Sequence, residues 1–197
     1  MARRAYLTVE LAPPEMNGPA SEEALAALER MTGHALPAGL RKAWLVADGQ
    51  GITPDAPLFW RTEDDDDGRL VGYDFLSVEQ AREAHVEQSR RTTRADRTPR
   101  DSRIGDGAFL RGWLPFADFG AGAALLMIDL DPSPMGVIGQ IIARSDDPPG
   151  VAWIAGSFDE LVALSLAALE SDPDYVLQEV AQDGEITGRR PRRDDRE

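Results

Sequence analysis

Two periodic apolar patterns near the start of the chain predict a pair of helices. The first covers residues 19–33, and the second begins near Pro37 and ends where the sequence reads DGQG, at residues 48–51. Apolar residues in both segments recur every three or four positions, as on one face of a helix: Leu25, Leu28 and Met31, then Leu36, Leu40 and Trp44. Each predicted helix is short, so its apolar face needs a neighbouring element to cover it.

A longer unit, residues 113–169, has the pattern of a strand hairpin, a third short strand and a closing helix. Its apolar runs at 123–130 and 137–143 are separated by DPSPMG, whose prolines and glycine cannot continue a strand ladder. We therefore predict a hairpin with a long loop. Shorter runs at 58–60 and 70–75 predict two further strands that pair with each other.

Two capping boxes mark the starts of further helices. In Ser77-Val78-Glu79-Gln80 the serine and glutamine side chains can satisfy free backbone donors reciprocally, and the predicted helix runs to about residue 89. Ser157-Phe158-Asp159-Glu160 has the same pattern. Although Gly156 precedes Ser157, the second glycine of a nucleophile elbow is missing, so we interpret Ser157 as a cap.

The sequence divides into one domain with appendages. We predict an N-terminal arm at 1–18, a domain at 19–175 and a C-terminal extension at 176–197 that is disordered at its end. Residues 90–103, RRTTRADRTPRDSR, contain no apolar side chain larger than alanine. They are predicted to be a mobile, arginine-rich insertion on the surface.

Composition limits the class of protein. A chain of 197 residues with 42% hydrophobic content can bury one ordinary core. It has no run of eighteen apolar residues, and its start, MARRAYLTVELAPPE, lacks the apolar stretch of a secretory signal. We therefore expect a soluble, cytoplasmic protein. Because the chain has no cysteine, disulfides, thiolate nucleophiles and cysteine-based zinc sites are excluded.

The net charge of −14 is unevenly distributed along the chain. Residues 1–88 carry −8 and residues 104–188 carry −12, whereas residues 89–103 carry +4 and residues 189–197 carry +2. An acidic body repels phosphate backbones and anionic membranes, and it attracts a basic partner. The basic segments can bind nucleic acid locally, but no aromatic residue is interleaved with their arginines. The sequence is at least as consistent with contact between those arginines and the acidic body as with binding of nucleic acid.

The remaining candidate catalytic and metal-binding residues fit a structural role better than a chemical one. Five consecutive carboxylates at 63–67 lack the spacing of an EF-hand loop and are typical of a solvated loop. Asp129 and Asp131 could project from a strand end to one face, as paired carboxylates of an enzyme do, but they also fit a turn before Pro132. His34 and His85 lack metal-ligand spacing, and Gly120-Ala121-Gly122 precedes a strand instead of following one. We predict no cofactor and no metal.

Three blocks in this order resemble the SMI1/KNR4 family (SUKH superfamily): SEEALAALERMTGHALPAGLRKAWLVADGQG, WLPFADFGAGAALLMIDLDPSPMGVIGQII and VAWIAGSFDELVAL. The resemblance covers roughly residues 20–170. Where the family usually has Asn-Gly-Gly after the second helix, this chain has Asp48-Gly49-Gln50, and the arginine-rich insertion has no counterpart. The resemblance implies an α+β domain whose helices pack on a curved, mainly antiparallel sheet.

The resemblance also implies a function, because bacterial members of this family are typically immunity proteins that bind and neutralise a toxin domain. We therefore expect a non-enzymatic protein with a basic toxin domain as its partner and an unspecified oligomeric state. The alternative is a regulatory scaffold that binds endogenous cell-wall or signalling proteins. A third hypothesis is an enzyme that uses Asp129 and Asp131. The expected contact residues are an aromatic anchor ringed by carboxylates: Trp60, Glu63, Asp64, Asp65, Asp66, Asp67, Asp118, Asp129 and Asp131.

Overall fold

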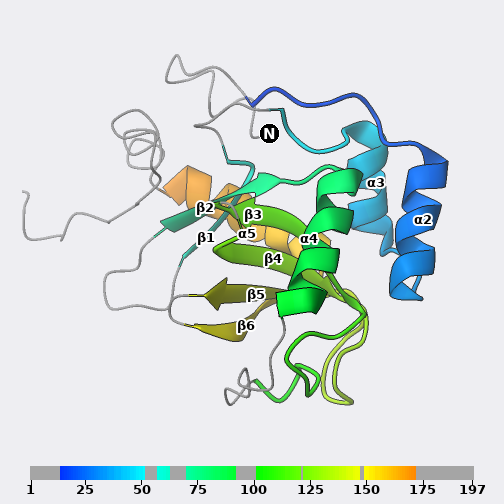
Figure 1. Cartoon of the computed structure of the whole chain (residues 1–197). Coiled ribbons are helices and arrows are strands. Elements are labelled where there is room, and N and C mark those ends of the chain that lie inside the picture. The colour runs from blue at the N-terminus through cyan, green and yellow to red at the C-terminus, as the bar shows by residue number, and fades with distance from the viewer. Residues whose placement is uncertain are drawn as a thin grey trace, which may run out of the picture.

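The described part of the chain forms one antiparallel sheet with four helices around it (Figure 1). The computed structural model describes residues 14–51, 57–62, 70–91, 101–120, 122–146 and 149–171. The strands follow one another in chain order across the sheet, each antiparallel to its neighbour. They are β1 (Phe59–Thr62), β2 (Leu70–Phe75), β3 (Trp113–Phe119), β4 (Ala124–Asp129), β5 (Gln140–Asp146) and β6 (Pro149–Ala155).

The helices lie on both faces of this sheet. They are α2 (Glu22–Thr32), α3 (Ala38–Val46), α4 (Val78–Arg91) and α5 (Phe158–Ser171). Figure 1 shows α4 crossing the near face and α5 the far face, with α2 and α3 beside α4. The predicted α+β class with an antiparallel sheet is therefore confirmed. The helix predicted to end near residue 89 continues two residues further, to Arg91.

The helix starts are held by the capping residues that the sequence indicates. Ser77 Oγ accepts from the Gln80 backbone N–H at 3.2 Å, and Gln80 Oε1 accepts from the Ser77 backbone N–H at 2.8 Å. At α5 the Glu160 backbone N–H donates to Ser157 Oγ at 3.1 Å. The capping box at α4 is therefore confirmed in both directions. At α5 the serine cap is confirmed, but Glu160 Oε2 accepts from the Gly156 backbone N–H at 2.8 Å instead of from that of Ser157. Ser157 thus has a structural role as the cap of α5.

Side chains alternate between the two faces of the central strands, which produces two apolar layers. The larger layer lies between the sheet and α5, and includes Leu114, Phe116, Leu126, Ile128, Ile141, Phe158 and Leu161. The smaller layer lies on the opposite face and includes Ile104, Phe109, Leu110, Trp113, Leu125, Met127 and Ile142. The segment 101–112 therefore covers one end of the second face.

The sheet curls around α5, and this helix covers the edge strand β1. Ser165 Oγ accepts from the Trp60 backbone N–H and donates to the Trp60 carbonyl, both at 3.1 Å. One buried hydroxyl thus satisfies backbone groups that an edge strand would otherwise leave unpaired. In β3 the register shifts between Pro115 and Ala117, because proline has no N–H to offer the ladder.

Because the strands form a meander, successive connections alternate between the two ends of the sheet. The last residues of β1, β3 and β5, Thr62, Phe119 and Asp146, lie at one end of the sheet. The β4–β5 loop, the segment that leads into β3 and the start of α5 lie at the other end. Residues 1–13, 92–100 and 172–197 lie outside the described residues, and for these residues the predicted arm, insertion and extension remain predictions. At the two ends of the predicted insertion 90–103, Arg90 and Arg91 belong to α4, and residues 101–103 lead into the segment before β3.

Candidate functional site

The predicted aromatic anchor is part of the core. The side chain of Trp60 is 1% exposed, and its backbone is held by Ser165 of α5. Its ring also lies against Gly72 of the paired strand β2. The prediction of a surface anchor is therefore wrong for Trp60, because α5 covers the edge strand on which it lies.

The predicted pair Asp129 and Asp131 is divided between the interior and the surface. Asp129 ends β4 and is 0% exposed. Its Oδ2 accepts from Gln140 Nε2 at 2.9 Å, and its Oδ1 accepts from the Asp131 backbone N–H at 3.0 Å. Burial raises the pKa of Asp129, whereas Asp131 is exposed. The two carboxylates do not project together from one face, because Asp129 turns inward to hold the loop that follows.

Asp118 lies beside a carboxylate that the sequence reasoning missed. It is the cross-strand partner of Asp74, whose Oδ1 accepts from Gln50 Nε2 at 2.8 Å. Burial and the charge of Asp118 raise the pKa of Asp74 to about 6. Burial also raises the pKa of Asp118, although its carboxylate accepts from the Gly122 backbone N–H at 2.8 Å. Only the strand pairing brings these two aspartates together.

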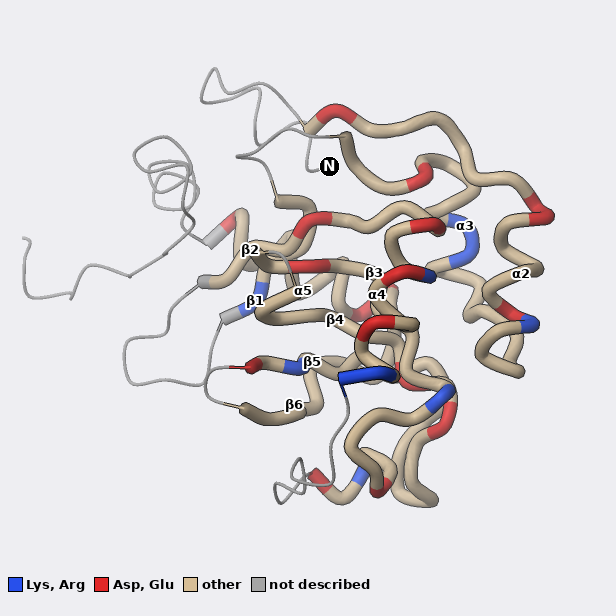
Figure 2. The backbone as a smooth tube through the Cα atoms, in the orientation of Figure 1, with Lys and Arg blue, Asp and Glu red and all other residues tan. Residues whose placement is uncertain are grey.

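We call Asp74, Asp118 and Asp146 the acidic end of the sheet. The Asp146 backbone N–H donates to Ala123 in the β3–β4 turn at 3.0 Å, and its carboxylate lies 3.5 Å from the Arg144 guanidinium. Figure 2 shows acidic positions along β2 and β3 and at the end of β5. The predicted acidic run 63–67 connects β1 to β2 and lies outside the described residues.

The opposite end carries an exposed apolar group, two residues of which, Val137 and Ile138, were predicted to lie in a strand. Met135, Val137 and Ile138 are 71%, 62% and 68% exposed, and we call them the apolar tip. The predicted hairpin is confirmed, but β5 begins only at Gln140. Gly139, with a φ of 89°, donates its N–H to the Asp129 carbonyl at 2.8 Å and closes the ladder there. Val137 and Ile138 are therefore left in the loop.

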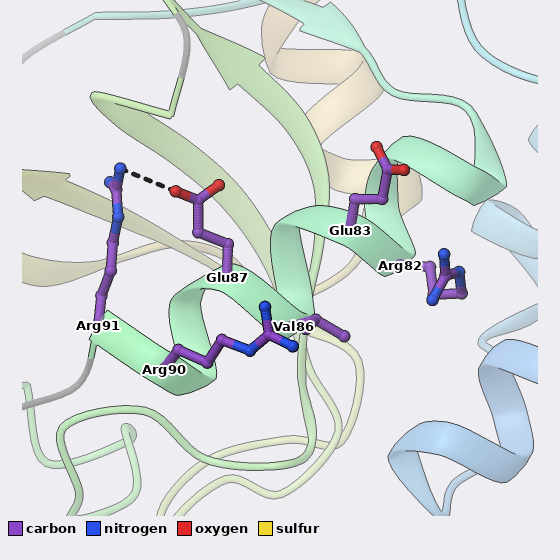
Figure 3. A pocket seen from close by; sticks show the side chains of 6 residues that line it. All are labelled: Arg82, Glu83, Val86, Glu87, Arg90 and Arg91. Atoms are coloured by element: carbon purple, nitrogen blue, oxygen red, sulfur yellow. Dashed lines mark ion pairs between the residues drawn. The ribbon is translucent and has the colours of Figure 1, made fainter.

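A groove of about 620 Å³ runs along the outer face of α4 (Figure 3). It is lined by Arg82, Glu83, Val86, Glu87, Arg90 and Arg91. Arg91 lies 2.9 Å from Glu87, and Arg82 pairs with Glu79 one turn earlier in the helix. Charges of both signs are mixed along this face and Val86 is the one apolar residue that lines it, so it offers neither a strong field of one sign nor a large apolar surface.

The groups most suited to chemistry support the fold. His85 Nε2 lies 2.9 Å from the Arg111 carbonyl, so this nitrogen carries the proton, and burial lowers the pKa of the imidazole. Ser157 is a cap, as described above. In the described ranges there is no group of three or more His, Cys, Asp or Glu residues arranged to hold a metal ion. None of the described helices is both long and apolar enough to cross a bilayer.

The fold and these surfaces define an α+β domain that presents an apolar loop at one end of its sheet and carboxylates at the other. Residues 19–164 match the SMI1 / KNR4 family (SUKH-1), and the chain belongs to this family. A search of curated proteins finds no match. The resemblance seen in the sequence is thereby confirmed over nearly the whole described part of the chain.

Proposed function

We propose that this protein is a non-enzymatic immunity protein that binds and neutralises a cognate toxin domain of a bacterial polymorphic toxin system. One observation carries the proposal. The described side chains best suited to chemistry support the fold, whereas the exposed features are those of a recognition surface. Ser157 caps a helix, His85 bonds to backbone and Asp129 holds a loop. Membership of the SMI1/KNR4 family supports the same function, since its bacterial members are typically immunity proteins.

The charge of the chain supports a basic partner. Toxins that cleave or modify nucleic acids carry basic surfaces because they bind phosphates, and an acidic inhibitor can occupy such a surface. The net charge of this chain is −14. In this proposal Asp118 and the acidic run 63–67 steer the partner toward the complex, and they contribute more to the rate of association than to its final strength.

Co-expression with the toxin domain encoded immediately upstream of this chain tests the proposal. Cells that express the toxin domain alone are expected to die, and cells that also express this protein are expected to survive and to yield a complex on purification. A toxin domain from an unrelated system serves as the control and is expected to kill in both cases. If the upstream domain kills equally with and without this protein, the proposal is wrong. Recovery of housekeeping proteins alone would favour the scaffold function.

A further inference from the structure

The apolar tip differs from the rest of the described surface because its exposed apolar side chains lie together. Six large apolar side chains in the described ranges are strongly exposed, and three of them lie within four positions of one loop. The other three are scattered singly: Met16, Val46 and Leu164. Scattered exposed apolar residues are normal on proteins, whereas a contiguous group marks an interaction site.

The loop that carries the tip is held on its inner side by buried polar groups. Gln140 Oε1 accepts from the Val137 backbone N–H at 3.2 Å, and Gln140 Nε2 donates to both Asp129 and the Arg103 carbonyl at 2.9 Å. Gln140 and Asp129 are 1% and 0% exposed. Burial of an amide and a carboxylate is costly, and here they fix the backbone that presents the tip.

The neighbouring segment 101–112 braces the other side of the loop. The Ser133 backbone N–H donates to the Arg103 carbonyl at 3.3 Å, and Ser133 Oγ donates to the Ser102 carbonyl. Ser133 Oγ also accepts from the Met135 backbone N–H at 3.1 Å. A loop that is held on both sides loses little conformational freedom when it binds, so its apolar side chains are suited to be anchors.

The charges around the tip determine which partner it fits. Asp131 at the start of the loop and Asp159 and Glu160 at the start of α5 are exposed at the same end of the sheet. The two arginines of segment 101–112 are engaged within the protein. Arg103 binds Asp101 and stacks over the Trp153 ring, and Arg111 donates to backbone carbonyls at the end of α2. An apolar group flanked by carboxylates complements an apolar pocket with a basic rim.

We propose that the apolar tip of Met135, Val137 and Ile138 is the anchor with which this protein docks into an apolar, basic-rimmed pocket of its toxin partner. This inference rests on the proposed immunity function and names the surface that performs it. A second copy of this chain is a poorer occupant, because it has the same net charge of −14 and would bring like charges together. An anionic membrane is repelled for the same reason.

The test measures binding of the intact chain to a catalytically inactive form of the upstream toxin domain by isothermal titration calorimetry. The triple variant Met135→Gln, Val137→Gln and Ile138→Gln leaves the charge unchanged and removes the apolar contact. Its Kd is expected to rise at least about tenfold. The double variant Val46→Gln and Leu164→Gln changes two apolar side chains that are exposed elsewhere on the surface, and its Kd is expected to stay within about twofold of that of the natural chain.

The outcomes distinguish this inference from the proposed function. If the natural chain and the triple variant bind equally well, the tip is not the anchor, although the immunity function stands. If the natural chain does not bind the upstream domain at all, both proposals are wrong. Gel filtration of the free chain and sedimentation with phosphatidylglycerol vesicles complete the test. A dimer that the triple variant separates, or vesicle binding that it abolishes, would assign the tip to another occupant and overturn the inference.

Discussion

The two ends of the sheet differ in how tightly the backbone is packed. At the tip end a Cβ atom added to Gly136 would lie 2.2 Å from the Arg103 carbonyl oxygen, and one added to Gly112 would lie 2.9 Å from the Asp131 nitrogen. At the acidic end Gly120, Gly122 and Gly150 have no such neighbour within 4 Å. The apolar tip is thus supported by a close-packed base, whereas the backbone at the acidic end is open and its main feature is charge.

The largest expected effect comes from removing the buried carboxylate under the tip. Asp129→Ala leaves the donors of Gln140 and Asp131 without their acceptor in the interior. We expect the free energy of unfolding to fall by about 2–4 kcal/mol. Urea unfolding measures the change. The matched control is Asp131→Ala, an exposed neighbour, with an expected loss of at most about 0.5 kcal/mol. Equal effects of the two variants would show that Asp129 does not hold the loop.

A smaller loss of stability is expected from crowding the base of the tip. Gly136→Ala places a methyl group against the backbone of segment 101–112, which has to move. We expect a loss of about 1–3 kcal/mol. Gly150→Ala is the control at the acidic end, where the added carbon meets open space, and it is expected to be nearly neutral. Thermal unfolding measures the melting temperatures of both variants. If the two melting temperatures fall equally, the two ends do not differ in how tightly their backbones are packed.

At the acidic end we expect a substitution to stabilise the protein. The pKa of Asp74 rises from its ordinary value of 3.8 to about 6, mainly through burial and then through the charge of Asp118. The folded state therefore binds the proton more tightly than the unfolded chain. The contribution of Asp74 to the free energy of unfolding is therefore fully present below about pH 4. It is lost as the pH rises through about 6.

Asp74→Asn removes this penalty and keeps an acceptor for Gln50. At pH 7 we expect the variant to be more stable than the natural chain by about 1 kcal/mol, after allowing for solvent screening of a half-buried group. At pH 4 the difference is expected to disappear. Urea unfolding at both pH values measures it. A difference that does not change with pH would contradict the role of this carboxylate.

The smallest expected effect concerns the rate of association. Asp118→Asn removes one charge from the acidic end, and we expect it to slow association with the proposed basic toxin partner about twofold to threefold at low salt. The effect is expected to vanish at high salt, where exposed charges are screened. Stopped-flow measurements separate the two rates. A change confined to the dissociation rate would show that Asp118 makes direct contact in the complex.

The sequence by itself determined the elements that depend on local physical chemistry. Ser77 and Gln80 cap α4 as their spacing predicts, and Ser157 caps α5. The strand predicted at 70–75 has those bounds in the structure. These features are predictable because caps, turns and apolar periodicity involve residues only a few positions apart.

Only the tertiary structure decided which polar and apolar side chains are exposed. Trp60 turned inward because α5, a hundred residues later in the chain, covers its strand. Val137 and Ile138 looked like part of a buried strand, yet the ladder closes at Gly139 and leaves them exposed. The physical reason is that burial depends on which distant segments meet. A run of apolar residues describes one segment only and does not specify which other segment covers it.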